Sequence, residues 1–459
     1  MRKIIYLFTA VTAITALFSC ATADLPYAYR TDNETAQYTE MPPADFPETR
    51  FCVFSDPHTF DTALGTSGPD FAEYMKQDRK MLIESTDILK KAMSMMADFP
   101  ADFVIVPGDL TKDGERVSHE TFAGYLKIIE ATGRPVYVVP GNHDILNPHA
   151  VRFTSEGHEK VDTVTPEDFS AIYGEYGYSE ALYRDSHSLS YTAEPVEGLW
   201  LLAMDSADYE NNIEDDYPQT DGSFSMETLA WIESILQEAV KKEKAVIAFM
   251  HHGIAEHYAS QEKHYGEYIV DDYSNFSELL AAYNVRTVFT GHYHAQDIVQ
   301  APVDYKDKFI FDIETGSLVT YPSPVRYVEI SEDQKMKISS HFVEELPGFT
   351  AKGQSLPEYS RAFLRQGIEG IAVEVMKSLK VKEEDAERAA PQIADAFIAH
   401  YQGDEKFTGD QMLTKKGMGF MGRLVLTVRK SLITGLWNDP APSDNNIVID
   451  LTTGDWSGI

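Results

Sequence analysis

Five apolar runs of the sequence end directly in histidine, aspartate or asparagine. The polar residues at these ends are Asp56, His58, Asp109, Asn142, His143, His251, His252, His292 and His294. Three of the ends follow a glycine, which lets the backbone bend sharply and side chains converge. Imidazole, carboxylate and amide donors without any thiolate suit Zn, Mn, Fe or Mg. Even seven of these nine residues exceed the needs of one tetrahedral ion, so the pattern predicts two metal ions that share a carboxylate.

The apolar runs before these ends are typical of buried strands. They span residues 51–54, 103–106, 136–139, 245–250 and 287–290, and a similar run spans 199–204. Segments with apolar residues at helical spacing separate the first three runs, which predicts a parallel sheet with crossover helices. In such sheets, ligands bind beyond the carboxyl ends of the strands. A single polar end could be a capped turn, but five ends of one kind favour a shared site.

Polar segments interrupt the strands at residues 145–190, 208–222 and 254–273. We expect the first two to set substrate size, and we expect His257 and His264 of the third to lie at the surface. Three further strands, near 309–313, 325–330 and 336–342, are expected to close the domain as a β-meander.

The chain becomes helical after Pro347, with one helix predicted to begin near Pro391. Residues 417–437 are mostly apolar but carry Arg423, Arg429 and Lys430. We expect this stretch to be a buried helix of a small bundle, and an interfacial membrane helix is the alternative.

The net charge of the 459-residue chain is −34. Such an acidic surface argues against a nucleic-acid partner and against adhesion to anionic membranes. It would also repel phosphorylated substrates unless bound metal ions reversed the local field.

The N-terminus has the pattern of a signal peptide over residues 1–19, because Arg2 and Lys3 precede an apolar run too short to span a membrane. The run ends in Leu17-Phe18-Ser19-Cys20, which resembles a bacterial lipobox. This resemblance implies lipidation of Cys20 and a place in the bacterial cell envelope. Because Phe18 is unusual there, cleavage nearby by an ordinary signal peptidase is the alternative. Residues 20–48 are expected to tether the lipid anchor to the folded domain.

The polar strand ends resemble, in order, the motif blocks of the calcineurin-like metallophosphoesterase family. The blocks read Asp56-Pro57-His58, Gly108-Asp109, Gly141-Asn142-His143-Asp144, His251 and Gly291-His292-Tyr293-His294. Residues 108–114 look like the branch that includes class III cyclic-nucleotide phosphodiesterases. The resemblance spans residues 49–342. It implies a four-layer α/β/β/α sandwich of two mixed sheets, with a catalytic domain at 49–345 and a mainly helical extension at 346–459.

The resemblance also implies a role for each residue of the site. One metal ion would bind Asp56, His58 and His294, the other would bind Asn142, His251 and His292, and Asp109 would bridge them. Two cations about 3.5–4 Å apart can hold a bridging water as hydroxide, which attacks the phosphoester in line. The metal ions would be divalent or trivalent.

Four side chains beside the ligands have expected roles. His143 follows a ligand and is the natural general acid for the leaving oxygen, with Asp144 orienting it. His252 is a candidate substrate contact. Asp113 is expected to cap a helix in preference to touching the site.

These observations predict a binuclear metal hydrolase of small phosphoesters, with phosphodiesters favoured by residues 108–114. A phosphomonoesterase such as a nucleotidase or acid phosphatase, using the same site, is the alternative. A partner-binding lipoprotein on a phosphoesterase scaffold is the alternative that is not an enzyme.

Overall fold

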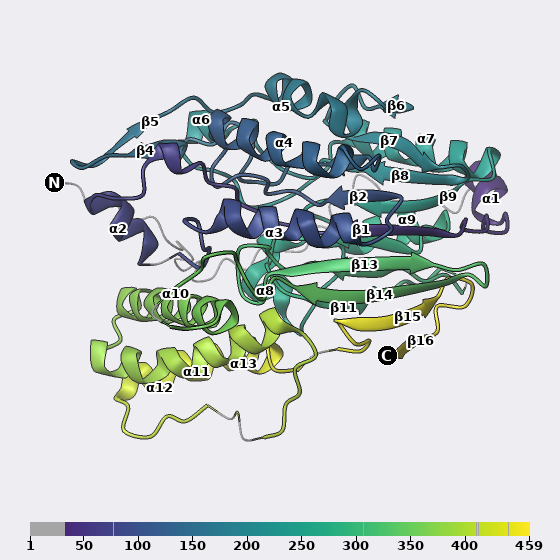
Figure 1. Cartoon of the computed structure of the whole chain (residues 1–459). Helices are drawn as coiled ribbons and strands as arrows, with labels where there is room; N and C mark the ends of the chain where they lie inside the picture. Colours follow the sequence, from purple (N-terminus) through teal and green to yellow (C-terminus); the bar gives the residue numbers. More distant parts are fainter. Residues whose placement is uncertain are drawn as a thin grey trace.

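The computed structural model describes residues 33–459 apart from 77, 306, 352, 410, 412 and 439. The predicted signal peptide and Cys20 therefore lie outside the described residues. Two seven-stranded mixed sheets form the centre of the molecule (Figure 1). This confirms the predicted α/β fold with two mixed sheets.

Sheet 1 has the strand order β16-β15-β14-β13-β1-β2-β3. Its strands are β1 (Thr49–Val53), β2 (Phe103–Val106), β3 (Val136–Val138), β13 (Pro324–Ile330), β14 (Lys335–Phe342), β15 (Asn446–Asp450) and β16 (Trp456–Gly458). The first three strands pair in parallel, as their separation by helices predicted. The remaining strands add antiparallel neighbours on the other side of β1.

Sheet 2 has the order β11-β12-β10-β9-β8-β7-β6. Its strands are β6 (Tyr183–Arg184), β7 (Tyr191–Val196), β8 (Leu199–Ala203), β9 (Ala245–Phe249), β10 (Thr287–Thr290), β11 (Asp297–Gln300) and β12 (Phe311–Glu314). The expected β-meander is wrong, because β12 pairs with β10 in this sheet whereas β13 and β14 belong to sheet 1.

The inner faces of the two sheets pack against each other, and the ring centroids of Phe51 and Phe289 lie 5.3 Å apart across this interface. The outer face of sheet 1 is covered by α3 (Ser85–Asp98) and α4 (Arg116–Glu130). The outer face of sheet 2 buries a separate apolar cluster against α7 (Met226–Lys241) and α9 (Tyr273–Ala282). The result is four layers, and the inter-sheet core fixes the strand ends from both sheets relative to one another.

Shorter helices and strands lie outside the two large sheets. They are α1 (Asn33–Thr39), α2 (Pro69–Met75), β4 (Val151–Phe153), β5 (His158–Lys160), α5 (Pro166–Ile172), α6 (Asn212–Asp215) and α8 (Gln261–Tyr265). The described end of the predicted tether packs on the domain, because Phe46 is buried in the core and the Thr39 carbonyl accepts a hydrogen bond from Lys308.

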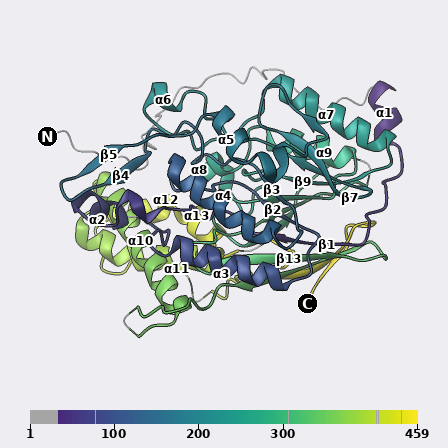
Figure 2. The same cartoon turned by 45° about the horizontal axis from the view of Figure 1, so that its top comes forward.

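Helices α10 (Leu356–Ser378), α11 (Glu383–Gln402), α12 (Phe420–Val428) and α13 (Lys430–Gly435) gather at one end of the sandwich (Figure 1). Helix α10 lies beside α2 in both views (Figure 1 and Figure 2). At Gly367 of α10, an added Cβ would lie 2.3 Å from the Asp78 carbonyl oxygen. This glycine lets α10 press closely on the segment that follows α2.

Three details of the C-terminal region differ from the sequence interpretation. The second helix begins at Glu383 and contains Pro391 instead of starting there. Residues 446–458 return to sheet 1 as β15 and β16, so the last part of the predicted helical extension consists of strands of sheet 1. The expectation of a buried helix is wrong for α12, whose Phe420 is 74% exposed and whose Val428 is 64% exposed. Within the described residues, no helix is both long enough and apolar enough to cross a membrane.

Candidate metal centre

The polar ends of five strands, β1, β2 and β3 from sheet 1 and β9 and β10 from sheet 2, meet at one edge of the sandwich. Two groups of donor atoms form there, each with all atoms within 4.8 Å of one another. The first contains Asp56, His58, Asp109 and His294, and the second contains Asp109, His251 and His292. All six side chains are buried. Asp109 belongs to both groups, which is the position that a bridging ligand requires.

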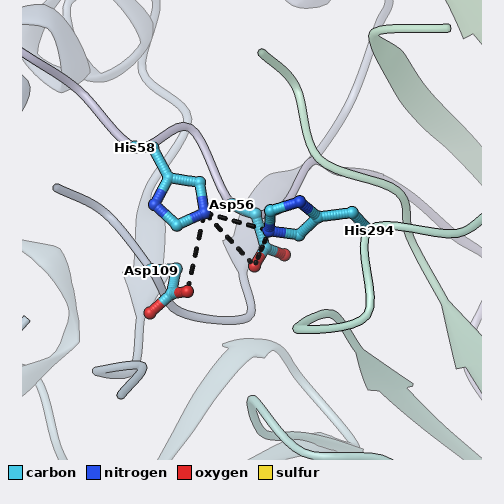
Figure 3. Close-up of side chains that lie close together, drawn as sticks. All are labelled: Asp56, His58, Asp109 and His294. Atoms are coloured by element: carbon cyan, nitrogen blue, oxygen red, sulfur yellow. Dashed lines mark hydrogen bonds and ion pairs between the residues drawn. The ribbon is translucent and has the colours of Figure 1, made fainter. Parts of the chain in front are cut away.

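Figure 3 shows the first group. The Nε2 atoms of His58 and His294 face each other at 3.0 Å. His58 Nε2 lies 3.6 Å from Asp109 Oδ2, and His294 Nε2 lies 3.5 Å from Asp56 Oδ1. Two imidazoles and two carboxylates thus point their donor atoms at one small volume.

The second group is centred on His251. Its Nε2 lies 3.4 Å from Asp109 Oδ2 and 3.2 Å from the amide oxygen of Asn142. The structure thereby brings Asn142 to the second group, where the resemblance places it. All seven predicted ligands lie in one or the other group or in direct contact with it.

Backbone carbonyls orient the imidazole rings from behind. His251 Nδ1 donates to Pro107 at 2.8 Å, and His58 Nδ1 lies 3.3 Å from the Thr111 carbonyl. In both rings this leaves Nε2 with a free lone pair for a metal. His292 is turned the other way, because its Nε2 lies 3.1 Å from the Thr220 carbonyl, which leaves Nδ1 free. These carbonyls are backbone atoms and carry no sequence signal.

The ligands lie on unusual backbone conformations. Asp56, His58, Asp109, His292 and His294 all have φ between 36° and 75°. Such left-handed geometry costs a non-glycine residue on the order of 1–3 kcal/mol. Five cases among seven ligands mean that the surrounding fold holds these turns against their intrinsic preference.

The glycines before the ligands supply space as well as flexibility. An added Cβ at Gly141 would lie 2.3 Å from Asp109 Oδ1, and one at Gly291 would lie 2.3 Å from Asp56 Oδ2. Neither position allows a side chain without moving a carboxylate. Gly108 differs, since its φ of 94° itself favours glycine.

The electrostatics of the site fit bound cations. Among the described residues, every ion pair of Asp56 and Asp109 is with a histidine and none is with lysine or arginine. Burial alone would raise the pKa of Asp109, but His251 and its neighbours outweigh it and hold that pKa well below its usual range. Buried carboxylates that pair with inward-facing imidazoles, and with no lysine or arginine of the described residues, fit a pair of divalent metal ions.

His143 lies beside this centre and is not one of the grouped ligands. Its Nε2 is 4.0 Å from Asp109 Oδ2, and its side chain is 25% exposed whereas the Asp109 side chain is 1% exposed. Its Nδ1 lies 2.8 Å from Asp113 Oδ1 and 2.6 Å from the Lys112 carbonyl. Burial and Lys80 lower the pKa of His143, but the carboxylates of Asp109 and Asp113 outweigh them and raise it. Because Nδ1 is engaged and the side chain is partly exposed, Nε2 is the nitrogen that can carry a proton toward a bound substrate.

The residue that orients His143 is Asp113, where the sequence interpretation expected Asp144. Asp113 is buried, and its carboxylate also pairs with the buried Lys112. This contact corrects the expected helix-capping role of Asp113. No pattern within the 108–114 block distinguishes the two roles, because the contact joins loops that are 30 residues apart.

Asp144 instead holds the turn that carries Asp109. Its carboxylate accepts hydrogen bonds from the backbone N–H groups of Leu110, Thr111 and Gly141, at 3.0, 2.9 and 2.8 Å. Among the described residues, no hydrogen bond or ion pair joins the side chains of Asp144 and His143. The expectation that Asp144 orients the general acid is therefore wrong in its contacts, and the residue braces the metal-binding loops.

His252 is fully buried, and both of its ring nitrogens are engaged. Nδ1 lies 2.8 Å from Ser206 Oγ, and Nε2 lies 3.0 Å from the Thr220 carbonyl. Burial lowers its pKa to about 3, so the ring is neutral. These contacts place His252 behind the ligands, packed on His251 and His292, and not in the position of the predicted substrate contact.

Lys80 is a feature that the sequence interpretation missed. It is 8% exposed, and its positive charge lowers the pKa of His58, His143 and His294. Among the described residues, no carboxylate lies within ion-pair distance of Lys80. A buried, unpaired cation beside the centre suits a phosphate oxygen. Lys80 follows α2 in a segment with no motif, which is why no signal pointed to it.

His257 is also buried, contrary to its expected surface position. Its Nδ1 lies 3.1 Å from Asp297 Oδ1, and its Nε2 lies 3.1 Å from Asp312 Oδ2. This ion-paired cluster lies apart from the donor groups described above.

A family model described as "Calcineurin-like phosphoesterase" matches residues 49–296. The chain belongs to this family. The matched segment contains every residue of the two donor groups, so the chain is a metal-dependent phosphoesterase with a site of the two-metal type.

A probable cyclic nucleotide phosphodiesterase from Fibrobacter succinogenes is similar to this phosphoesterase, with 23% identity over 230 residues. That match covers 49% of this chain and 70% of the relative. A dimetal phosphatase from Danio rerio is 15% identical with a TM-score of 0.46, covering 65% of this chain and 97% of that one. A purple acid phosphatase from yellow lupin seeds is 14% identical with a TM-score of 0.41, covering 66% and 52%.

Proposed function

We propose that this phosphoesterase hydrolyses phosphodiesters, with His143 as the general acid. The observation that carries the proposal is the arrangement at His143, whose Nδ1 is held by Asp113 and whose Nε2 lies 4.0 Å from Oδ2 of the shared ligand Asp109. When a phosphodiester is hydrolysed, its leaving group departs as an alkoxide or phenoxide that needs a proton. His143 is placed to donate that proton. The named activity of the Fibrobacter relative supports the same substrate class.

Each residue then has a defined task. The two donor groups hold two metal ions, such as Mn, Fe, Zn or Mg. When bound, these ions supply a water of lowered pKa and neutralise the charge on the phosphoryl oxygens. Lys80 supplies positive charge to a phosphoryl oxygen of the substrate. Asp113 accepts the Nδ1–H of His143 and stabilises the imidazolium form, whose Nε2–H is the proton given to the leaving oxygen.

Phosphomonoesters are the second candidate, and Lys80 is the observation that favours them. A monoester dianion carries one more negative charge than a diester, so an unpaired lysine near the centre stabilises it more. Lys80→Met would then lower kcat/KM for 4-nitrophenyl phosphate more than for bis(4-nitrophenyl) phosphate.

The test is the turnover of these two substrates by the protein reconstituted with Mn, Fe, Zn or Mg in turn. We expect the diester to be hydrolysed with the higher kcat/KM, and we expect chelation to abolish the activity. A preference for the monoester in every metal form would replace the proposal with the phosphomonoesterase. Stoichiometric metal binding without hydrolysis of either ester would instead favour the partner-binding protein.

We also propose that residues 1–19 direct export and that Cys20 is lipidated, which would anchor the enzyme in the bacterial cell envelope. Only the sequence supports this step. Metabolic labelling with a radioactive fatty acid is expected to mark the wild-type chain and not Cys20→Ser. Equal labelling of both chains, or labelling of neither, would overturn the lipidation.

A further inference from the structure

A cleft of about 750 Å³ separates the catalytic domain from the C-terminal helices. One wall is the insert that includes α8 and the loop after it, with Tyr265 and Tyr268 facing the cleft. The other wall is built from α10, α11, α12 and α13. The volume lies within the range of ligand pockets, which is about 300–1,000 Å³.

The helical wall of the cleft is aliphatic. Its apolar lining includes Ile371, Val375, Leu379, Ile393, Val425 and Ile433. A nucleobase needs hydrogen-bonding partners on its edges, and this wall is mostly apolar, with Ser378 and Arg429 as its polar side chains. Such a wall suits an alkyl chain. The charged side chains that line the cleft are mostly acidic, which disfavours a second anionic group there: Asp221, Glu262, Glu267, Asp271 and Asp272 outnumber Arg79, Lys263 and Arg429.

The cleft ends next to the metal centre. The ring of Tyr268 packs on that of His292 with centroids 4.4 Å apart, and it packs on Tyr293 at 4.8 Å. Arg79, which precedes Lys80, also lines the cleft and donates to Tyr401 Oη at 2.8 Å. None of the seven metal ligands lines the cleft. It is therefore a neighbouring compartment, one tyrosine side chain away from a ligand.

Helix α12 continues this compartment to the surface. Val425 and Leu426 line the cleft, while Phe420, Leu424 and Val428 of the same helix are exposed. Residues 411–438 contain five Lys or Arg residues and no Asp or Glu, in a chain whose net charge is −34. An exposed apolar stripe flanked by basic residues is typical of a helix that lies in a membrane interface. Asp385 of α11 accepts a hydrogen bond from the Gly419 N–H at the start of α12, and acidic residues farther away than a Debye length of about 8–10 Å are screened.

We infer that the cleft binds the alkyl chain of a lipid phosphoester, and that the exposed face of α12 seats the cleft mouth on an anionic membrane. The inference rests on the proposed phosphoester hydrolysis and specifies its substrate class. It gives one role to three features that catalysis at the metal ions leaves unused: the aliphatic wall, the outward Phe420 and Val428, and the local reversal of charge.

The chain-binding step is tested with two substrates that share a leaving group, octyl 4-nitrophenyl phosphate and ethyl 4-nitrophenyl phosphate. We expect the wild-type kcat/KM to be about tenfold or more higher for the octyl ester, because its extra methylene groups are buried. Val375→Trp narrows the cleft and should remove most of this preference without changing ethyl ester turnover. Glu374→Trp adds the same ring on the exposed side of α10 and should leave the preference intact. A wild-type preference near one, or an equal effect of both variants, overturns the chain site.

Binding without turnover separates this inference from the proposed function. Titration calorimetry of the metal-loaded protein with octyl phosphonate and ethyl phosphonate should show tighter binding of the octyl compound, lost in Val375→Trp. If neither ester is hydrolysed but this difference is present, the proposed hydrolysis fails and the chain site stands. If Val375→Trp does not fold, Leu379→Trp fills the same wall.

Flotation with vesicles tests the role of α12. The full chain without its leader is expected to bind phosphatidylglycerol vesicles and not phosphatidylcholine vesicles, and Phe420→Ser combined with Val428→Ser should abolish binding. Because both side chains are exposed, the double variant should keep wild-type turnover of the ethyl ester. Equal recovery of wild type and double variant with anionic vesicles would refute the membrane contact, as would binding that ignores lipid charge.

Discussion

Replacing Asp113 with asparagine is expected to slow the hydrolysis of phosphodiesters with poor leaving groups while both metal ions stay bound. The substitution replaces the carboxylate that lies 2.8 Å from His143 Nδ1 with a neutral amide of the same shape. A hydrogen bond to a charged group contributes about 1.5–3 kcal/mol. If that contribution appears in the transition state, kcat falls by about 10- to 150-fold.

The assay is a series of diesters whose leaving groups range from 4-nitrophenol to an aliphatic alcohol. His143→Ala and Asp113→Asn should both retain metal, lose most activity on the poorest leaving groups and steepen the dependence of rate on leaving-group pKa. Because Asp113 raises the pKa of His143, Asp113→Asn should also move the basic limb of the pH–rate profile to lower pH. Equal losses for every leaving group, or loss of a metal ion, would refute the assignment of an acid and its orienting carboxylate. Asp113→Asn also removes an ion-pair partner of the buried Lys112, so thermal melting is used to check that the variant is still folded.

Three further substitutions test the supports of the site. Gly141→Ala should lower the metal content, because its Cβ would meet Asp109, and should destabilise the fold by about 1–3 kcal/mol. In the control Gly124→Ala, the added Cβ meets no atom within 4 Å, so metal analysis and thermal melting should match wild type. Lys80→Met should lower kcat/KM by about tenfold with metal retained, and the exposed Lys90→Met should match wild type in the same kinetics. Asp144→Asn should lose metal affinity and about 1–3 kcal/mol of unfolding free energy in denaturant titrations; full metal content would show that the Asp109 turn does not need this brace.

The strand ends made the metal ligands predictable from sequence. Each ligand follows an apolar run, and parallel strands bring their carboxyl ends to one edge, so seven donors distant in sequence had to converge. The family resemblance added that two sheets, and not one, contribute them. The shared position of Asp109 follows from its place just after β2, which lies between β1 and β3, the strands that Asp56 and Asn142 follow.

The contacts around the ligands were not predictable for a physical reason. Asp144 is next to His143 in sequence, but adjacent side chains on a turn point apart, and the orienting carboxylate comes from Asp113 on another loop. The carbonyls of Pro107 and Thr220 orient ligand rings as backbone atoms, which any residue type supplies.

Of two other misses, β15 had a signal that could have been used and the burial of His257 had none. The alternating burial of Ile447 and Ile449 is the period-two pattern of a strand, and β15 joins sheet 1. His257 lies in a polar insert, but its partners Asp297 and Asp312 come from strands that follow it by 40 residues or more, so its burial depended on tertiary structure.

The central claim is that one carboxylate, Asp109, joins two metal sites. The most direct measurement is the metal-to-protein ratio, by inductively coupled plasma mass spectrometry, of wild type, Asp109→Asn and Asp56→Asn after reconstitution and gel filtration. We predict two ions per chain in wild type, loss of both in Asp109→Asn, and loss of one in Asp56→Asn. A single ion in the wild type, or an Asp109→Asn protein that keeps one ion at full occupancy, would contradict the shared-ligand centre.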